Sequence, residues 1–91
     1  MIKWIYKPNG NCPIQSEGYF LGKYFYFRAR WNNVKIEFSN SENDWHKNIY
    51  KSFLVYKTGE YEAGHLKKWF CILLIYKGCL MYLFDNIKNK L

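Results

Sequence analysis

The sequence predicts an α+β domain in which an antiparallel β-meander packs against one long C-terminal helix. Two observations predict this class. Residues 14–38 divide into three short runs at two turn signals, and the residues after His65 repeat their apolar side chains every three or four positions. With 91 residues and no linker-like stretch, the chain has the size of one domain. We therefore expect a single domain over residues 1–91.

The first element is a short strand over residues 1–6, where the chain is apolar. Residues 7–11, Lys-Pro-Asn-Gly-Asn, have the composition of a turn that ends it. The first hairpin of the meander follows, with Leu21-Gly22 as its turn. This turn pairs Tyr19 with Tyr24 and leaves Gly18 on the core face opposite Phe25.

The second hairpin is predicted from Asn32-Asn33 as a two-residue loop. Trp31 then faces Val34, and all apolar residues of both strands lie on one face. That face comprises Phe25, Phe27, Ala29, Trp31, Val34, Ile36 and Phe38. On the opposite face, the same register places Arg28 across from Glu37 and Arg30 across from Lys35.

After the meander, Ser41 followed by Asp44 resembles a capping box, which predicts a short helix through about Tyr50. Residues 53–56 fit either a fourth strand or a continuation of that helix. Thr58-Gly59 and Ala63-Gly64 then mark a loop.

The C-terminal segment has the spacing of a long helix lying on the sheet, with the apolar sheet face meeting Trp69, Leu73, Leu80 and Phe84. Because residues 69–84 are nearly all apolar, a hairpin turning at Lys77-Gly78 is an alternative. A membrane span is not expected, since this run of 16 residues contains Lys77 and is shorter than the roughly 20 needed.

Composition indicates a binding protein of a reducing compartment. The net charge of +7 favours nucleic acid, an anionic membrane or an acidic protein as partner. Aromatic residues make up 22% of the chain, and Tyr and Trp suit contact surfaces as well as cores. Three cysteines, Cys12, Cys71 and Cys79, are an odd number without a secretory signal, which predicts a reducing, cytoplasmic location, with Cys71 and Cys79 as buried thiols.

The best candidate binding site is the polar face of the meander. Aromatic rings can stack on bases, and guanidinium groups can hold phosphate. The predicted binding residues are Tyr24, Tyr26, Arg28, Arg30 and Lys35. The competing interpretation is a covered or solvated face on which Glu37 neutralises Arg28.

No pattern indicates catalysis, a metal or a cofactor. His46 and His65 lie near acidic residues, but neither has a nucleophile at a suitable spacing. The cysteines and histidines lack the paired close spacings of a zinc site, and no glycine-rich phosphate loop is present. We expect a protein that is not an enzyme and has no cofactor.

Residues 15–30, Gln-Ser-Glu-Gly-Tyr-Phe-Leu-Gly-Lys-Tyr-Phe-Tyr-Phe-Arg-Ala-Arg, resemble a motif of small proteins of bacteria and their phages. The resemblance covers about a sixth of the chain. It implies a mobile-element protein, and such proteins often inhibit host defence complexes, including CRISPR effectors. The expected function is thus contact with a host defence protein or nucleoprotein complex. The alternatives are direct binding of RNA or DNA and a homodimer formed through the C-terminal helix.

Overall fold

The computed structural model describes residues 2–11, 13–59 and 63–90. Five antiparallel strands form one sheet in chain order: β1 (Ile2–Asn9), β2 (Ile14–Phe20), β3 (Lys23–Arg30), β4 (Asn33–Ser39) and β5 (Lys51–Lys57). The helices are α1 (Glu42–His46), a 3-10 turn η1 (Ala63–His65) and the long α2 (Lys68–Lys90). The predicted α+β class, with a meander against a C-terminal helix, is confirmed.

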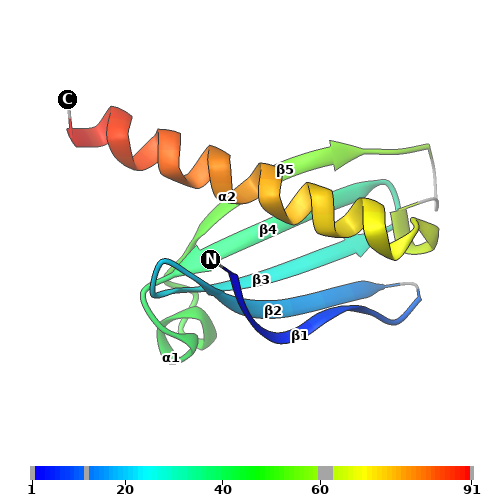
Figure 1. Ribbon diagram of the computed structural model, residues 1–91, viewed down its shortest axis with the longest axis horizontal. Helices are drawn as coiled ribbons and strands as arrows, with labels where there is room; N and C mark the ends of the chain where they lie inside the picture. Colours follow the sequence, from blue (N-terminus) through cyan, green and yellow to red (C-terminus); the bar gives the residue numbers. More distant parts are fainter. Residues whose placement is uncertain (1, 12, 60–62, 91) are drawn as a thin grey trace.

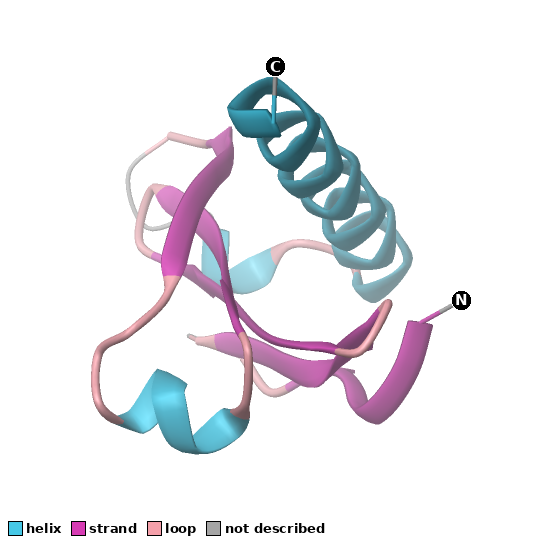
Figure 2. Cartoon of the chain, turned by 90° about the vertical axis from the view of Figure 1, so that its left-hand side faces the viewer, coloured by secondary structure: helices cyan, strands magenta, loops and turns pink. Residues whose placement is uncertain are grey.

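The two helices lie on opposite faces of the sheet. Figure 1 shows α2 running across the strands, and Figure 2 shows α1 on the other side of the sheet. The core lies between α2 and the sheet. The face next to α1 therefore remains available for function.

Strand β1 is longer than expected, because residues 7–9 continue it instead of forming the turn. Its pairing with β2 is irregular between Tyr6 and Asn9, and the chain turns at Gly10, whose φ of 89° suits glycine. Pro8 has no backbone N–H group to donate. It is accommodated because β1 is an edge strand, and the outer edge of such a strand pairs with no neighbour.

The first hairpin has the predicted register. Tyr19 pairs with Tyr24 and Gly18 with Phe25, across a turn in which Leu21 and Gly22 both have positive φ. A Cβ atom on Gly18 would lie 2.9 Å from the Phe25 ring and 2.7 Å from the carbonyl oxygen of Lys3. Glycine is therefore required here, because Phe25 packs directly over its backbone.

The second hairpin has a different register from the predicted one, displaced by two residues. Its turn residues are Trp31 and Asn32, so Arg28 pairs with Lys35 and Ala29 with Val34. The turn is held by tertiary hydrogen bonds, since the Trp31 carbonyl accepts from the Ala63 amide at 2.7 Å. A shift of two residues preserves the apolar face, which is why the hydrophobic pattern could not detect it.

Trp31 is consequently not part of the core, contrary to the prediction. It has φ 56° and is 57% exposed. The remaining predicted face residues of β3 and β4 are buried: Phe25, Phe27, Ala29, Val34, Ile36 and Phe38.

The predicted capping of α1 is confirmed, since the Ser41 side chain accepts from the Asp44 amide at 3.1 Å. The helix ends at His46 and not near Tyr50, because Asn48 adopts a positive φ of 63°. Residues 53–56 belong to strand β5.

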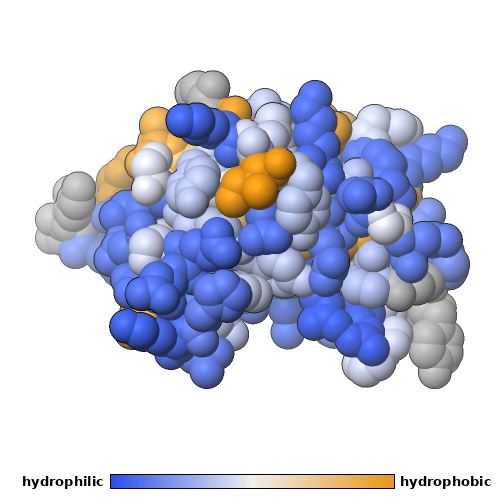
Figure 3. All heavy atoms as spheres, turned by 90° about the horizontal axis from the view of Figure 1, so that it is seen from below, coloured by the Kyte–Doolittle hydropathy of each residue, from blue (hydrophilic) through white to orange (hydrophobic). Residues whose placement is uncertain are grey.

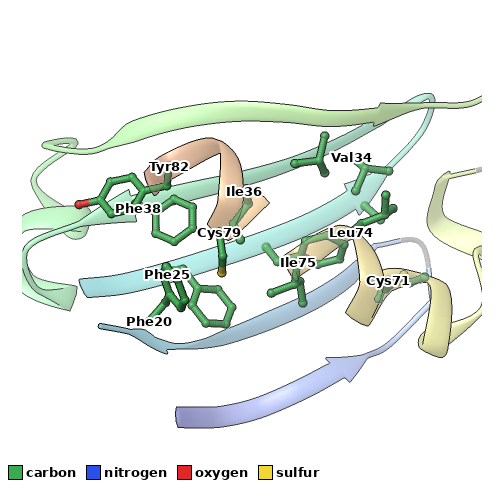
Figure 4. Packing of buried hydrophobic residues seen from close by; sticks show 14 of the residues in the cluster. Phe20, Phe25, Val34, Ile36, Phe38, Cys71, Leu74, Ile75, Cys79 and Tyr82 are labelled. Atoms are coloured by element: carbon green, nitrogen blue, oxygen red, sulfur yellow. The ribbon is translucent and has the colours of Figure 1, made fainter. Parts of the chain in front are cut away.

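Helix α2 is continuous, so the alternative hairpin at Lys77-Gly78 is wrong. The helix packs on the sheet through side chains that Figure 4 shows pointing toward Phe38, Ile36 and Val34. They are Cys71, Leu74, Ile75, Cys79 and Tyr82. The predicted contact face was wrong, because Trp69, Leu73, Leu80 and Phe84 are all more than half exposed.

The side of α2 that carries its smallest residues is the side that packs against the sheet. A Cβ atom on Gly78 would lie 2.5 Å from Cγ2 of Ile36 and 3.2 Å from Cγ1 of Val55. Glycine and the small side chains of Cys71 and Cys79 thus let the helix axis come near the strands, whereas bulkier residues occupy its outer side.

Candidate basic and aromatic hollow on the sheet

The sheet face opposite α2 carries an open hollow of about 460 Å³. Figure 3, which views the molecule from below, shows largely hydrophilic side chains on this side. We call the concavity the basic hollow. It is lined by Tyr26, Arg28, Arg30, Trp31, Asn33, Lys35, Glu37, Trp45 and Tyr50.

Three cross-strand pairs of β3 and β4 form the floor: Tyr26 with Glu37, Arg28 with Lys35, and Arg30 with Asn33. The central pair sets two positive side chains directly opposite each other, an arrangement that destabilises a sheet when nothing neutralises it. Among the described residues, neither Arg28 nor Lys35 forms a salt bridge, and the buried Nε of Arg28 has no hydrogen-bond acceptor.

The predicted ion pair between Arg28 and Glu37 is not formed. Glu37 lies across from Tyr26 and accepts a hydrogen bond from Nε1 of Trp45 at 2.8 Å. Only one form of the competing interpretation, in which Glu37 neutralises Arg28 on a solvated face, depended on that pair. The other form, a face covered by a helix, holds in part, since Trp45 of α1 packs over the buried Tyr24. Three cations against one carboxylate leave a formal charge of +3 − 1 = +2 in the hollow.

Two tryptophans contribute the aromatic surface from outside the strands. Trp31 comes from the β3–β4 turn, where its ring lies beneath the Arg30 guanidinium, 4.5 Å from Cζ to the ring centroid. Trp45 comes from α1 and packs against Tyr26 at 4.8 Å between ring centroids. Since Trp45 also donates to Glu37, its ring is fixed on the sheet.

Tyr24 lies on the predicted face but does not line the hollow. It is completely buried, with Trp45 and Tyr19 packed against its ring, and its hydroxyl donates to Glu17. Burial, together with the Glu17 carboxylate, raises the pKa of Tyr24 above its usual value. Its place in the fold is beneath Trp45 and not at the binding surface.

Tyr26, which lies on the same face of β3, does line the hollow. Its hydroxyl accepts from Nε2 of Gln15 at 2.7 Å, and burial raises the pKa of this phenol. Tyr26 is thus a neutral, fixed ring at physiological pH. Of the five predicted site residues, the hollow brings together four: Tyr26, Arg28, Arg30 and Lys35.

Sequence reasoning missed four lining residues, Trp31, Asn33, Trp45 and Tyr50. Trp31 was assigned to the core because of the register error. Trp45 and Tyr50 lie in the α1 region, whose position beneath the sheet has no signature in a local pattern. The one available signal was the capping box, which places Trp45 inside a helix directly after β4.

The histidines and cysteines within the described ranges do not gather into a metal site. His46 lies 3.4 Å from Glu42 at the exposed surface of α1. The described residues hold no group of three or more His, Cys, Asp or Glu side chains that could bind a metal ion. Cys71 and Cys79 are buried free thiols, as expected, whereas Cys12 lies outside the described residues.

Comparison with known proteins yields no match to a family model, a curated protein or a solved structure. The resemblance to mobile-element proteins therefore stays a prediction, and the basic hollow is the feature of the fold that bears on function.

Proposed function

We propose that this protein binds single-stranded nucleic acid in the basic hollow. The observation that carries the proposal is the cross-strand pair of Arg28 and Lys35, two cations without a carboxylate partner among the described residues, set between tryptophan rings. A phosphate between them would relieve their mutual repulsion, and a base could stack on Trp31 or Trp45.

A single strand fits better than a duplex because the aromatic surfaces can only be used by unstacked bases. The duplex major groove is normally entered by an exposed polar helix or ribbon. Helix α1 has five residues, and the exposed side of α2 is apolar, so neither offers such an element.

The test is fluorescence anisotropy with labelled oligo-dT and oligo-rU. Three cations in contact with phosphates predict that log K falls with log salt with a slope of about −2 for single strands. The double variant Arg28→Gln/Lys35→Gln should bind at least tenfold more weakly than wild type. The matched control Lys7→Gln/Lys88→Gln carries the same charge change on exposed residues outside the hollow.

Loss of binding in the hollow variant, with the control close to wild type, would support the proposal. Equal weakening of both variants, or an affinity independent of salt, would overturn it. The inhibition of a host defence complex stays a prediction from the motif, since no observation in the structure favours it over direct binding of nucleic acid.

A further inference from the structure

A continuous apolar stripe follows the outer side of α2, away from the sheet. Its members are 42–69% exposed: Trp69, Leu73, Tyr76, Leu80, Phe84 and Ile87. We call it the outer stripe. Exposed apolar surface of this extent on a small domain marks a contact site.

The spacing of the outer stripe is that of a helix–helix seam. Successive members are four, three, four, four and three residues apart, close to the alternation of a heptad repeat. We propose that this stripe joins a second copy of the chain as an antiparallel helix pair.

The stripe complements itself under a two-fold axis near residue 78. Such an axis places Trp69 against Ile87 of the second copy and Tyr76 against Leu80. Leu73 then meets Phe84 and the half-buried Leu83. Every layer pairs apolar groups, and a two-fold interface requires this self-complementarity. Antiparallel helices also oppose their dipoles favourably.

The exposed apolar area of the outer stripe is large enough for a weak but specific dimer. Six half-exposed large side chains present roughly 600 Å² per copy, since an aromatic side chain buries 150–250 Å² in full. Two copies would bury about 1,200 Å², which is the lower limit for specific interfaces. Interfaces at this lower limit are often transient, so we expect a reversible dimer that is detected at micromolar protein concentrations.

A lipid surface is the principal rival, because Lys68–Asn89 is long and apolar enough to cross a membrane. Crossing would expose the core that α2 covers. A helix lying on anionic lipid uses flanking lysines as anchors. Here Lys77 donates to the Val55 carbonyl, Lys68 to the Gly10 carbonyl and Lys51 to Asp85, at 2.7–2.8 Å. These three ammonium groups already have partners within the protein, which leaves Lys67 and Lys88, both exposed, as the flanking lysines free to reach lipid among those described. Since fewer lysines are available to anchor the helix, the apolar self-complementarity of the stripe favours a second copy.

The proposal is tested by sedimentation equilibrium on the full chain from 5 to 200 µM. Wild type should show a reversible monomer–dimer equilibrium. The central-layer variant Tyr76→Lys/Leu80→Lys should shift the dissociation constant at least thirtyfold toward monomer, with an unchanged near-ultraviolet circular dichroism spectrum. Ile49→Lys, which places a lysine at an exposed apolar loop residue outside the outer stripe, should dimerise like wild type.

Orientation is tested by mixing two chains that each carry Cys12→Ser and one new exposed cysteine, Trp69→Cys or Ile87→Cys, while the native Cys71 and Cys79 stay buried between α2 and the sheet. Mixed disulfides on mild oxidation support the antiparallel pair, whereas disulfides between two Trp69→Cys chains would overturn it. Monomeric wild type at 200 µM would overturn the dimer. Flotation of the protein with phosphatidylserine vesicles, abolished by Tyr76→Lys/Leu80→Lys in a monomeric protein, would assign the stripe to lipid instead.

Discussion

Arg28 of β3 lies directly across from Lys35 of β4, and neither is neutralised by a carboxylate among the described residues. Two like charges at opposed sheet positions reduce stability, so this pair is a cost that the fold carries. Functional sites commonly carry such a cost, because the optimum for binding and the optimum for folding differ.

The variant Lys35→Glu should therefore separate stability from binding. It would place a carboxylate across from Arg28, and the new pair should raise the free energy of unfolding by about 0.2–1 kcal/mol. The same change should abolish oligonucleotide binding. Thermal melting and anisotropy measure the two effects, with Lys7→Glu as the control. A less stable Lys35→Glu protein would contradict the register of β3 and β4.

Trp31→Gly is predicted to weaken binding at least fivefold without loss of stability. The φ of 56° at Trp31 disfavours any residue with a side chain, and the ring is 57% exposed, so glycine should relieve strain in the turn. Trp31→Ala retains the strain and should bind as weakly while melting at a lower temperature than Trp31→Gly. Unchanged affinity in both variants would remove Trp31 from the site.

Phe27→Ala should destabilise the domain by about 3–5 kcal/mol, which is a large share of the stability of a domain of this size. Phe27 is fully buried on the α2 side of β3. Urea denaturation followed by circular dichroism gives the value. A loss below 1 kcal/mol would show that the residue does not face the core.

Gly78→Ala should destabilise the fold although alanine favours helices. The added Cβ would meet Ile36 at 2.5 Å, and such overpacking costs about 1–3 kcal/mol against a helix-propensity gain of about 1 kcal/mol. In a double-mutant cycle, Ile36→Ala should absorb part of the Gly78→Ala penalty, because it removes the conflicting methyl group. Additive losses would indicate that α2 does not approach β4 at this residue.

The thiol of Cys79 should stay protonated and unreactive in the folded protein. Burial raises its pKa from about 9 to about 12. Because the folded pKa lies above the unfolded one, the thiol's contribution to stability is present below about pH 9 and is lost between about pH 9 and pH 12. At pH 8, Ellman's reagent on a Cys12→Ser protein should label both remaining thiols only after denaturation. Rapid labelling of the native protein would mean that the buried side of α2 is misassigned.

Turn signals and apolar periodicity were sufficient for the fold class and the first hairpin, but they left open whether residues 69–84 form one helix or a hairpin at Lys77-Gly78. They could not identify which side of α2 is buried, because that helix is apolar around most of its circumference. The prediction assigned large apolar side chains such as Trp69 and Phe84 to the core, although both are exposed. The decisive signal was the small residues Cys71, Gly78 and Cys79, which permit close packing.

The candidate site was predicted only in part, because strand pairing and coverage by α1 both depend on tertiary contacts. Alternation along β3 placed Tyr26, Arg28 and Arg30 on one face, but the partner of each depended on a turn fixed by distant hydrogen bonds. Tyr24 shares that alternation, yet Trp45 covers it. Coverage by a helix from another part of the chain is a tertiary property that strand periodicity does not contain.

Successive side chains of strand β3 point alternately into the core and into the basic hollow. Phe25, Phe27 and Ala29 are held in the core, while Tyr26 and Arg28, between them, form the floor of the hollow. The backbone of that floor is therefore ordered when the core folds. Binding of a ligand then requires little further loss of backbone conformational entropy. Natural variation on the ligand side can therefore alter which molecule is recognised without disturbing the packing that holds the protein together.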